Sequence, residues 1–79
     1  MSWKVYILRC ADNTLYTGVT RNLKRRIVEH QNGEGARYTR GRGPFELVYT
    51  ESFATRSEAQ RREYEIKAMA RQEKLKLLR

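Results

Sequence analysis

Five residues from four separate segments of the chain have the chemistry to act on a phosphate ester: Tyr6, Tyr16, Arg26, His30 and Glu63. A guanidinium can neutralise negative charge that develops on a transferred phosphate, and an imidazole can take or relay a proton near neutral pH. A phenol acts as a base only where a neighbouring cation favours its ionised form, and otherwise it orients a water molecule. The elements that carry these residues decide whether they can meet.

Glu63 lies beside the narrow apolar stripe of Ala59, Ile66 and Ala70 that helical spacing predicts. A carboxylate close to a core must be paired, protonated or bound to a cation. Periodicity alone favours a salt bridge with one of the arginines. The alternative is a single Mg²⁺ ligand, because Mg²⁺ keeps several waters and takes only one or two carboxylates beside a substrate phosphate.

The other candidates also have ordinary explanations. Arg26 and His30 are one helical turn apart and could together face an anion, but Arg26 could equally belong to a solvated helix face with Lys24 and Arg25. The two tyrosines could be sheet aromatics. One histidine and one cysteine are too few for a zinc site, and the simplest interpretation of Cys10 is a structural thiol.

The composition bounds the class of protein. The 79 residues carry a formal charge of +8 from 17 Lys and Arg against 9 Asp and Glu, and include one Cys. We expect a single domain over residues 1–79, in the reducing cytoplasm, with no membrane span. Nucleic acid is the leading partner, because basic side chains release counterions from phosphates, although charge alone equally allows a solvated basic protein.

The first half of the chain predicts a hairpin followed by a helix. Residues 3–9 and 14–19 read as strands joined by a turn at residues 11–13. A three-residue turn pairs Leu8 with Tyr16 and Tyr6 with Gly18, so both tyrosines point to the same face. Asn22 is a good N-cap for a helix to about His30, with a stop at Gly33.

The second half predicts a basic loop over residues 33–44 and a strand over 45–52. Thr55 and Glu58 form a capping box for a helix that should run to about Ala70. Residues 71–79 are a further helix or its continuation. The order ββαβαα predicts an α/β domain with a small three-stranded antiparallel sheet flanked by helices.

The motifs then suggest a family. The segments 4–6 (KVY) and 16–18 (YTG) resemble the paired motifs of the GIY-YIG endonuclease superfamily, with Lys4 and Thr17 in place of the usual Gly and Ile. Residues 16–26 are similar to the run that leads to the family's helical arginine, and His30 falls where the family has His or Tyr. Residues 58–67 resemble the metal-binding helix. The match covers nearly the whole chain, and residues 38–42 look like a small stand-alone bacterial subgroup.

This resemblance implies phosphodiester hydrolysis with one divalent cation, Mg²⁺ or Mn²⁺. On that pattern Glu63 holds the metal, and Arg26 stabilises charge on the phosphate. Tyr6 positions or deprotonates the attacking water, assisted by Tyr16 and His30. The phenols, the guanidinium and the acid should then share one shallow depression.

DNA is the partner that the resemblance implies, and its backbone would be contacted by basic residues of the first helix and the loop: Arg25, Arg37, Arg40 and Arg42. Because phosphate contacts do not specify sequence, we expect a structure-selective or weakly sequence-selective nuclease of DNA repair or recombination. It is expected to be a monomer, with a partner protein recruiting it. The alternatives are a non-catalytic nucleic-acid-binding module and a structural adaptor that docks through the leucine-rich end.

Overall fold

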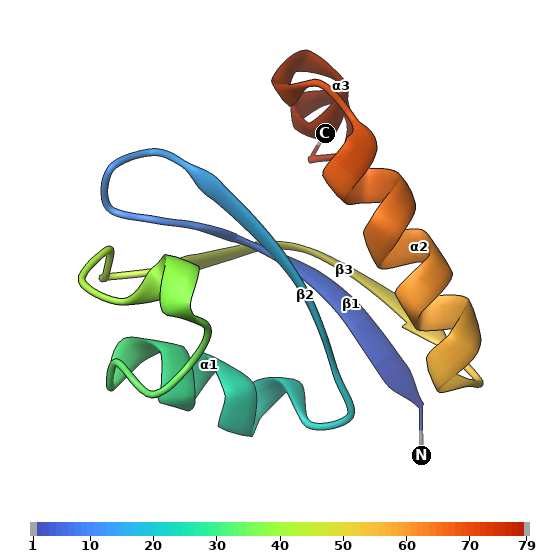
Figure 1. The fold of residues 1–79 in the computed structure, drawn as a ribbon, viewed down its shortest axis with the longest axis horizontal. Helices are drawn as coiled ribbons and strands as arrows, with labels where there is room; N and C mark the ends of the chain where they lie inside the picture. The colour runs from blue at the N-terminus through green and yellow to red at the C-terminus, as the bar shows by residue number, and fades with distance from the viewer. Residues whose placement is uncertain (1, 79) are drawn as a thin grey trace.

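Within residues 2–78, which this computed structural model describes, three strands and three α-helices follow the predicted order (Figure 1). The strands are β1 (Trp3–Arg9), β2 (Leu15–Thr20) and β3 (Glu46–Phe53), and the helices are α1 (Leu23–Gln31), α2 (Arg56–Ala68) and α3 (Arg71–Leu77). A 3₁₀ helix at Arg37–Thr39 interrupts the segment expected to be a loop. The predicted α/β class is confirmed.

The sheet is antiparallel throughout, with the order β2-β1-β3. A short turn closes the β1–β2 hairpin, in which the Cys10 amide donates to the Thr14 carbonyl at 2.8 Å. Asn13 takes a left-handed φ of 67°, which asparagine tolerates better than most residues. Tyr6 therefore lies opposite Gly18, and the predicted register and shared face are confirmed.

The core lies on the face of the sheet that α2 covers. Val5 and Ile7 of β1 pack there against Ala59 and Ile66 of α2, and all four are fully buried. The helix contacts all three strands. It begins at the predicted cap, where the Glu58 amide donates to the Thr55 hydroxyl at 3.2 Å.

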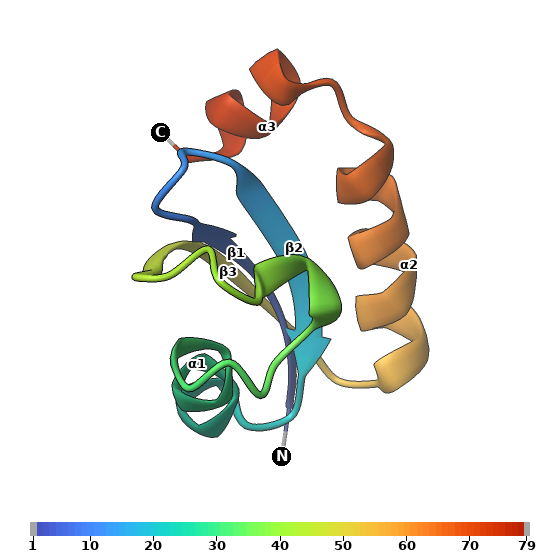
Figure 2. The same cartoon turned by 60° about the vertical axis from the view of Figure 1, so that its left-hand side comes forward.

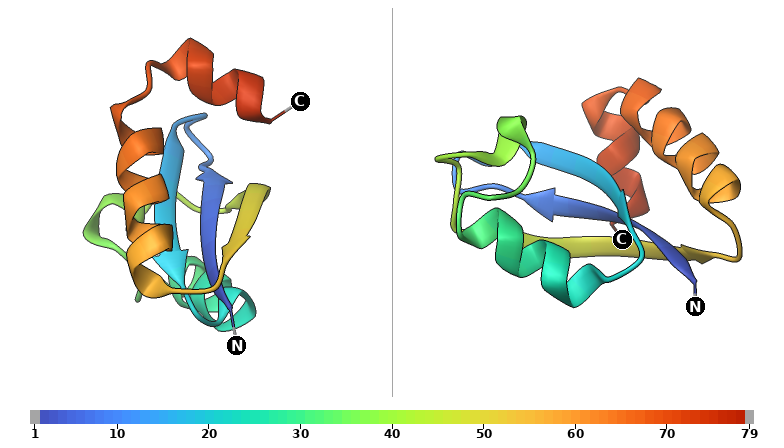
Figure 3. Two further views of the ribbon diagram at one scale, coloured as in Figure 1. Left: turned by 90° about the vertical axis from the view of Figure 1, so that its right-hand side faces the viewer. Right: turned by 60° about the horizontal axis from the view of Figure 1, so that its bottom comes forward.

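The opposite face carries Tyr6 and is covered by α1, so the two longer helices lie on opposite sides of the sheet (Figures 2 and 3). The Asn22 side chain caps α1 by accepting from the Arg25 amide at 3.1 Å. Past the end of α1, Gly33 has a φ of 78°, the left-handed conformation that commonly ends a helix. Cap and stop both agree with the sequence prediction.

The helix expected to run to about Ala70 ends two residues earlier, at Ala68, and the segment that follows is a further helix and not a continuation. Met69 adopts an extended conformation and packs its half-buried side chain against the core. Ala70, predicted in the apolar stripe, is exposed and begins α3, with its amide donating to the Glu73 carboxylate at 3.2 Å. No helix within residues 2–78 has the length and apolar character to cross a membrane.

Candidate active site

Tyr6 and Tyr16 lie together on the α1 side of the sheet, with ring centroids 6.3 Å apart. Tyr6 is completely buried, whereas Tyr16 is half-buried. The Tyr6 phenol lies across β2 at Gly18, where a Cβ atom would lie 2.5 Å from the hydroxyl oxygen. Glycine at this motif position is therefore required by the packing of the first tyrosine.

A hydrogen-bonded chain runs from Tyr6 through His30 to Thr39. The Tyr6 hydroxyl lies 2.8 Å from His30 Nε2, and His30 Nδ1 lies 2.8 Å from Thr39 Oγ1. The Thr39 hydroxyl donates its only proton to the Ala36 carbonyl at 2.9 Å, so it must accept from His30. The proton of the neutral imidazole is therefore on Nδ1, and Nε2 accepts from the Tyr6 hydroxyl.

His30 is buried inside the molecule and does not share an open surface with Arg26, as helical spacing had allowed. Its side chain points from α1 into the interior and packs against Tyr6 and Phe45. The ring centroid of Phe45 lies 6.0 Å from that of His30. Burial lowers the pKa of His30, and the charge of Arg26 lowers it further. Both effects favour the neutral ring that the hydrogen bonds require.

Tyr6 is a neutral phenol at physiological pH. Burial raises the pKa of Tyr6 to about 12, because a phenolate would lose its hydration. The Arg26 guanidinium lies close to the phenol and lowers this pKa, whereas the Glu63 carboxylate raises it. The pKa of Tyr6 thus responds to the charges of both Arg26 and Glu63.

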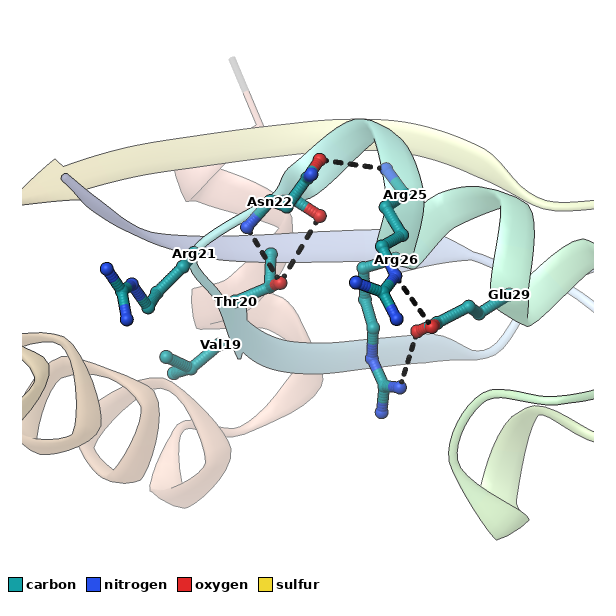
Figure 4. A pocket seen from close by; sticks show the side chains of 7 residues that line it. All are labelled: Val19, Thr20, Arg21, Asn22, Arg25, Arg26 and Glu29. Carbon is teal, nitrogen blue, oxygen red and sulfur yellow. Dashed lines mark hydrogen bonds and ion pairs between the residues drawn. The ribbon is translucent and has the colours of Figure 1, made fainter. Parts of the chain in front are cut away.

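Arg26 lines a hollow of about 320 Å³ between α1 and the end of β2 (Figure 4). Its Nη1 lies 3.0 Å from Glu29, which also pairs with Arg25 at 3.4 Å. Arg21 adds a third guanidinium to the same lining. One carboxylate against three guanidinium groups leaves the hollow positively charged, which suits a phosphate.

Glu63 comes from α2, on the far side of the sheet from α1, and its side chain is 23% exposed. It pairs with Lys67 at 3.2 Å, so the salt bridge expected from periodicity forms with a lysine of the next turn and not with an arginine. Lys67 lines the same hollow as Tyr16. Because β2 is an edge strand, α2 can present these side chains beside the tyrosine face.

The expected single depression is divided in two. Arg26 lines the hollow beside α1, whereas Tyr16 lines a different hollow with Lys67. Tyr6 is buried, and its pKa responds to both Arg26 and Glu63. Glu63 lines neither hollow, so the two phenols, the guanidinium and the acid do not share one cavity.

The residues present suit a hydrated metal ion that takes one ligand from the protein. Among residues 2–78, no three His, Cys, Asp or Glu side chains gather as a metal cluster. Glu63 is a lone, half-buried carboxylate whose present counter-charge is a lysine. That donor set suits Mg²⁺ or Mn²⁺, which keep their waters and share a site with a phosphate, and it does not suit zinc.

The basic loop contains two kinds of arginine. Arg37 and Arg40 are exposed. Arg42 instead holds the loop in place: its Nε donates to the Tyr38 carbonyl at 2.7 Å, and its guanidinium pairs with Asp12 in the hairpin turn. The expectation that all three track a nucleic-acid backbone therefore fits Arg37 and Arg40 better than Arg42.

Thr39 and Tyr38 contact the predicted site residues, although no pattern in the sequence predicts a role for either of them. The Tyr38 ring stacks on Tyr16 with a centroid distance of 5.9 Å. Neither residue follows a helical or strand period, because the 3₁₀ helix that carries them is a single turn. Their only signal in the sequence is their place within the segment 38–42 that resembles the stand-alone subgroup.

Known proteins match this chain over nearly its whole described length. The family model described as "GIY-YIG catalytic domain" matches residues 2–76. A UPF0213 protein of Oceanobacillus iheyensis is 58% identical over 74 residues, which are 94% of this chain and 86% of that protein. A UPF0213 protein of Clostridium perfringens is 60% identical over 74 residues, 94% of this chain and 80% of that protein.

Two solved structures share the fold. The solution NMR structure of a UPF0213 protein from Bacillus halodurans is 51% identical and superposes with a TM-score of 0.64, covering 99% of this chain and 83% of that chain. The solution NMR structure of a protein from E. faecalis is 41% identical with a TM-score of 0.65, covering 94% and 79% of the two chains. The fold of this chain thus recurs in relatives that are 41% and 51% identical to it.

Proposed function

Because the chain belongs to the GIY-YIG family and is similar to its UPF0213 proteins, we propose that it is a metal-dependent endonuclease that hydrolyses DNA phosphodiester bonds. The observation that carries the proposal is the Tyr6–His30 hydrogen bond beside the arginine-lined hollow. This arrangement places a proton acceptor next to a positively charged surface that suits a phosphate. Phosphoryl transfer to water requires both.

The Tyr6 phenol and His30 would act together on the attacking water. The Tyr6 proton already points to His30 Nε2, so the phenol oxygen can accept a proton from water while it passes its own to the imidazole. His30 keeps its Nδ1 proton on Thr39 and becomes an imidazolium. Tyr16, which is half-buried, would hold the water in place.

Arg26 would bind the phosphate that is attacked and stabilise its growing negative charge. In the absence of substrate it lies close to the buried Tyr6 phenol and pairs with Glu29. A phosphate in the hollow would draw the guanidinium away from Tyr6 and uncover the phenol oxygen. Substrate binding would therefore open the site to the attacking water.

Glu63 would hold the divalent cation, Mg²⁺ or Mn²⁺. When bound, such a cation supplies Lewis-acid stabilisation to the phosphate and its leaving oxygen. Lys67 occupies the carboxylate at 3.2 Å and has 51% of its side chain exposed, so it can turn away at little cost. Glu63 thereby stays paired before the cation arrives.

The surface favours recognition of DNA shape over sequence. Arg25, Arg37 and Arg40 are exposed basic residues of α1 and the loop, and such side chains contact phosphates, which position a duplex without specifying its bases. We therefore propose a structure-selective or weakly sequence-selective nuclease that acts in DNA repair or recombination, with a partner protein directing it to its target.

A cleavage assay tests this function against a binding module without catalysis. Supercoiled plasmid and branched DNA are incubated with Mg²⁺ or Mn²⁺ and with wild type, Tyr6→Phe, Arg26→Ala or Glu63→Gln. We expect wild type to cut and Tyr6→Phe to lose about 10²–10⁴-fold in rate. All three variants should still bind DNA. Binding by wild type with no cutting of any substrate would establish the non-catalytic module instead.

A further inference from the structure

A second hollow of about 360 Å³ lies on the α2 side of Tyr16 and is separate from the arginine-lined one. It is bounded by β2, the 3₁₀ helix, α2 and α3. The residues that line it are Leu15, Tyr16, Thr17, Tyr38, Lys67 and Lys74. The lining contains two ammonium groups and no acid, so its charge suits an anion.

The break between α2 and α3 places both lysines on this hollow. Lys67 is in the last turn of α2, and Lys74 is in α3, beyond the extended residue Met69. Arg71 fixes α3 against the hairpin turn by donating to the Asn13 carbonyl at 2.9 Å. Within residues 2–78, Lys74 has no salt bridge, so its charge is free for a ligand. Among the same residues Lys67 pairs only with Glu63, and because 51% of its side chain is exposed it can turn from that carboxylate to a bound phosphate.

The wall of the hollow adds an aromatic surface and an unsatisfied hydroxyl. Tyr38 stacks on Tyr16 with an angle of 25° between the rings, and the Arg42 guanidinium lies 4.5 Å from the Tyr38 ring centroid. Thr17 is only 3% exposed, and its Oγ1 has no hydrogen-bond partner among the described residues. A buried hydroxyl without a partner is unfavourable, and a bound polar group would satisfy it.

We propose that this hollow is a second phosphate subsite, which binds the phosphodiester next to the one that is cleaved. The proposal rests on the proposed function in taking a nucleic-acid strand as the ligand. Lys67 and Lys74 hold the neighbouring phosphate, and the Tyr16–Tyr38 wall contacts the attached sugar. Because Lys67 Nζ lies 3.2 Å from Glu63, the subsite borders directly on the carboxylate assigned to the metal.

Binding of a short single-stranded DNA, measured by fluorescence anisotropy in EDTA, tests the charge of the subsite. The variant is Lys67→Gln/Lys74→Gln. Its matched control is Arg61→Gln/Lys76→Gln, which removes the same charge from exposed positions of the same two helices that line neither hollow. We expect only the subsite variant to reduce the slope of log K against log salt, by about 1.4 for two phosphate contacts.

Equal losses in the two double variants would overturn the subsite. A Lys67→Arg/Lys74→Arg variant guards against a loss of folding, because it keeps both charges and should restore the wild-type slope. A failure of Arg to restore binding, with the fold intact by circular dichroism, would also count against a phosphate site.

A neutral-linkage scan identifies which phosphate the subsite holds. Methylphosphonate is placed at one linkage at a time in the oligonucleotide. In wild type we expect one linkage at which neutralisation weakens binding by about tenfold, and at that linkage Lys67→Gln/Lys74→Gln should show no further loss. If the two effects simply add at every linkage, the assignment is wrong.

This test separates the subsite from the proposed function, because it needs neither metal nor cleavage. A chain that shows the coupling but never cuts DNA would keep the subsite and lose the nuclease. A chain that cuts DNA but shows no coupling at any linkage would keep the nuclease and lose the subsite.

Discussion

Gly18 and Tyr6 lie opposite each other in the β1–β2 hairpin, and the Tyr6 hydroxyl occupies the place where a side chain on Gly18 would begin. The hydroxyl cannot retreat, because it is bonded to His30 at 2.8 Å. The glycine of the second motif and the tyrosine of the first are therefore one packing unit.

Gly18→Ala should displace the Tyr6 ring and destabilise the protein by about 1–3 kcal/mol, as overpacking does. Urea unfolding measures the loss. The added methyl group would lie 2.5 Å from the hydroxyl oxygen and 2.6 Å from the ring carbon that bears it. The loss should be smaller in a Tyr6→Phe background, because that ring has no hydroxyl and is not held in place by a bond to His30. Strict additivity of the two substitutions would contradict the close contact.

Thr39→Val should leave the His30 Nδ1 proton without an acceptor, because valine matches the shape of threonine and lacks the hydroxyl. An unsatisfied buried donor costs about 1–3 kcal/mol, so the free energy of unfolding should fall by that amount. DNA cleavage should also slow, because the imidazole tautomer is no longer fixed. Thr39→Ser is the control and should retain both properties; a Ser variant as impaired as Val would refute the role of the hydroxyl.

Stability should decline as the pH falls through the ordinary range of histidine. Unfolded His30 takes up a proton near pH 6.5, about the reference value, whereas burial lowers the pKa of the folded residue. The unfolded state therefore binds more protons below about pH 6.5, and folding weakens until the folded pKa is passed. His30 is the chain's one histidine, so its ring NMR signal reports this pKa directly. A value at or above 6.5 would contradict the buried neutral ring.

The arginine-lined hollow should contribute phosphate contacts that are sensitive to salt. Arg21→Gln and Arg25→Gln should each reduce the salt slope of DNA binding by about one, with uniform weakening across sequences. Lys24→Gln, on the same helix but outside the lining, is the charge-matched control. A control that lowers the slope as much as either arginine would show that only total charge matters.

Arg42 and Arg40 should separate structural from binding effects within the basic loop. Arg42→Gln removes the Asp12 ion pair and the bond to the Tyr38 carbonyl, so we expect a loss of about 1 kcal/mol in the free energy of unfolding. Arg40→Gln should leave stability unchanged and weaken DNA binding instead. Unfolding curves and salt titrations of both variants distinguish the roles, and interchangeable behaviour would count against the anchor.

Local patterns determined much of the fold. Side chains alternate along a strand, so the turn length alone put Tyr6 and Tyr16 on one face. Asn22 and Thr55 offer cap acceptors at the starts of α1 and α2, and these local bonds do not depend on where the helices pack. Such features involve residues close in the chain or in direct register, and the sequence is sufficient for them.

Docking of the helices decided the rest. His30 is buried beneath Tyr6 because α1 and the 3₁₀ helix close over the same sheet face, a contact that helical period cannot indicate. Met69 leaves the helix to reach the core, and this turns Lys74 toward Tyr16. These contacts join distant segments, and their free energies exist only once the layers of the fold are in place.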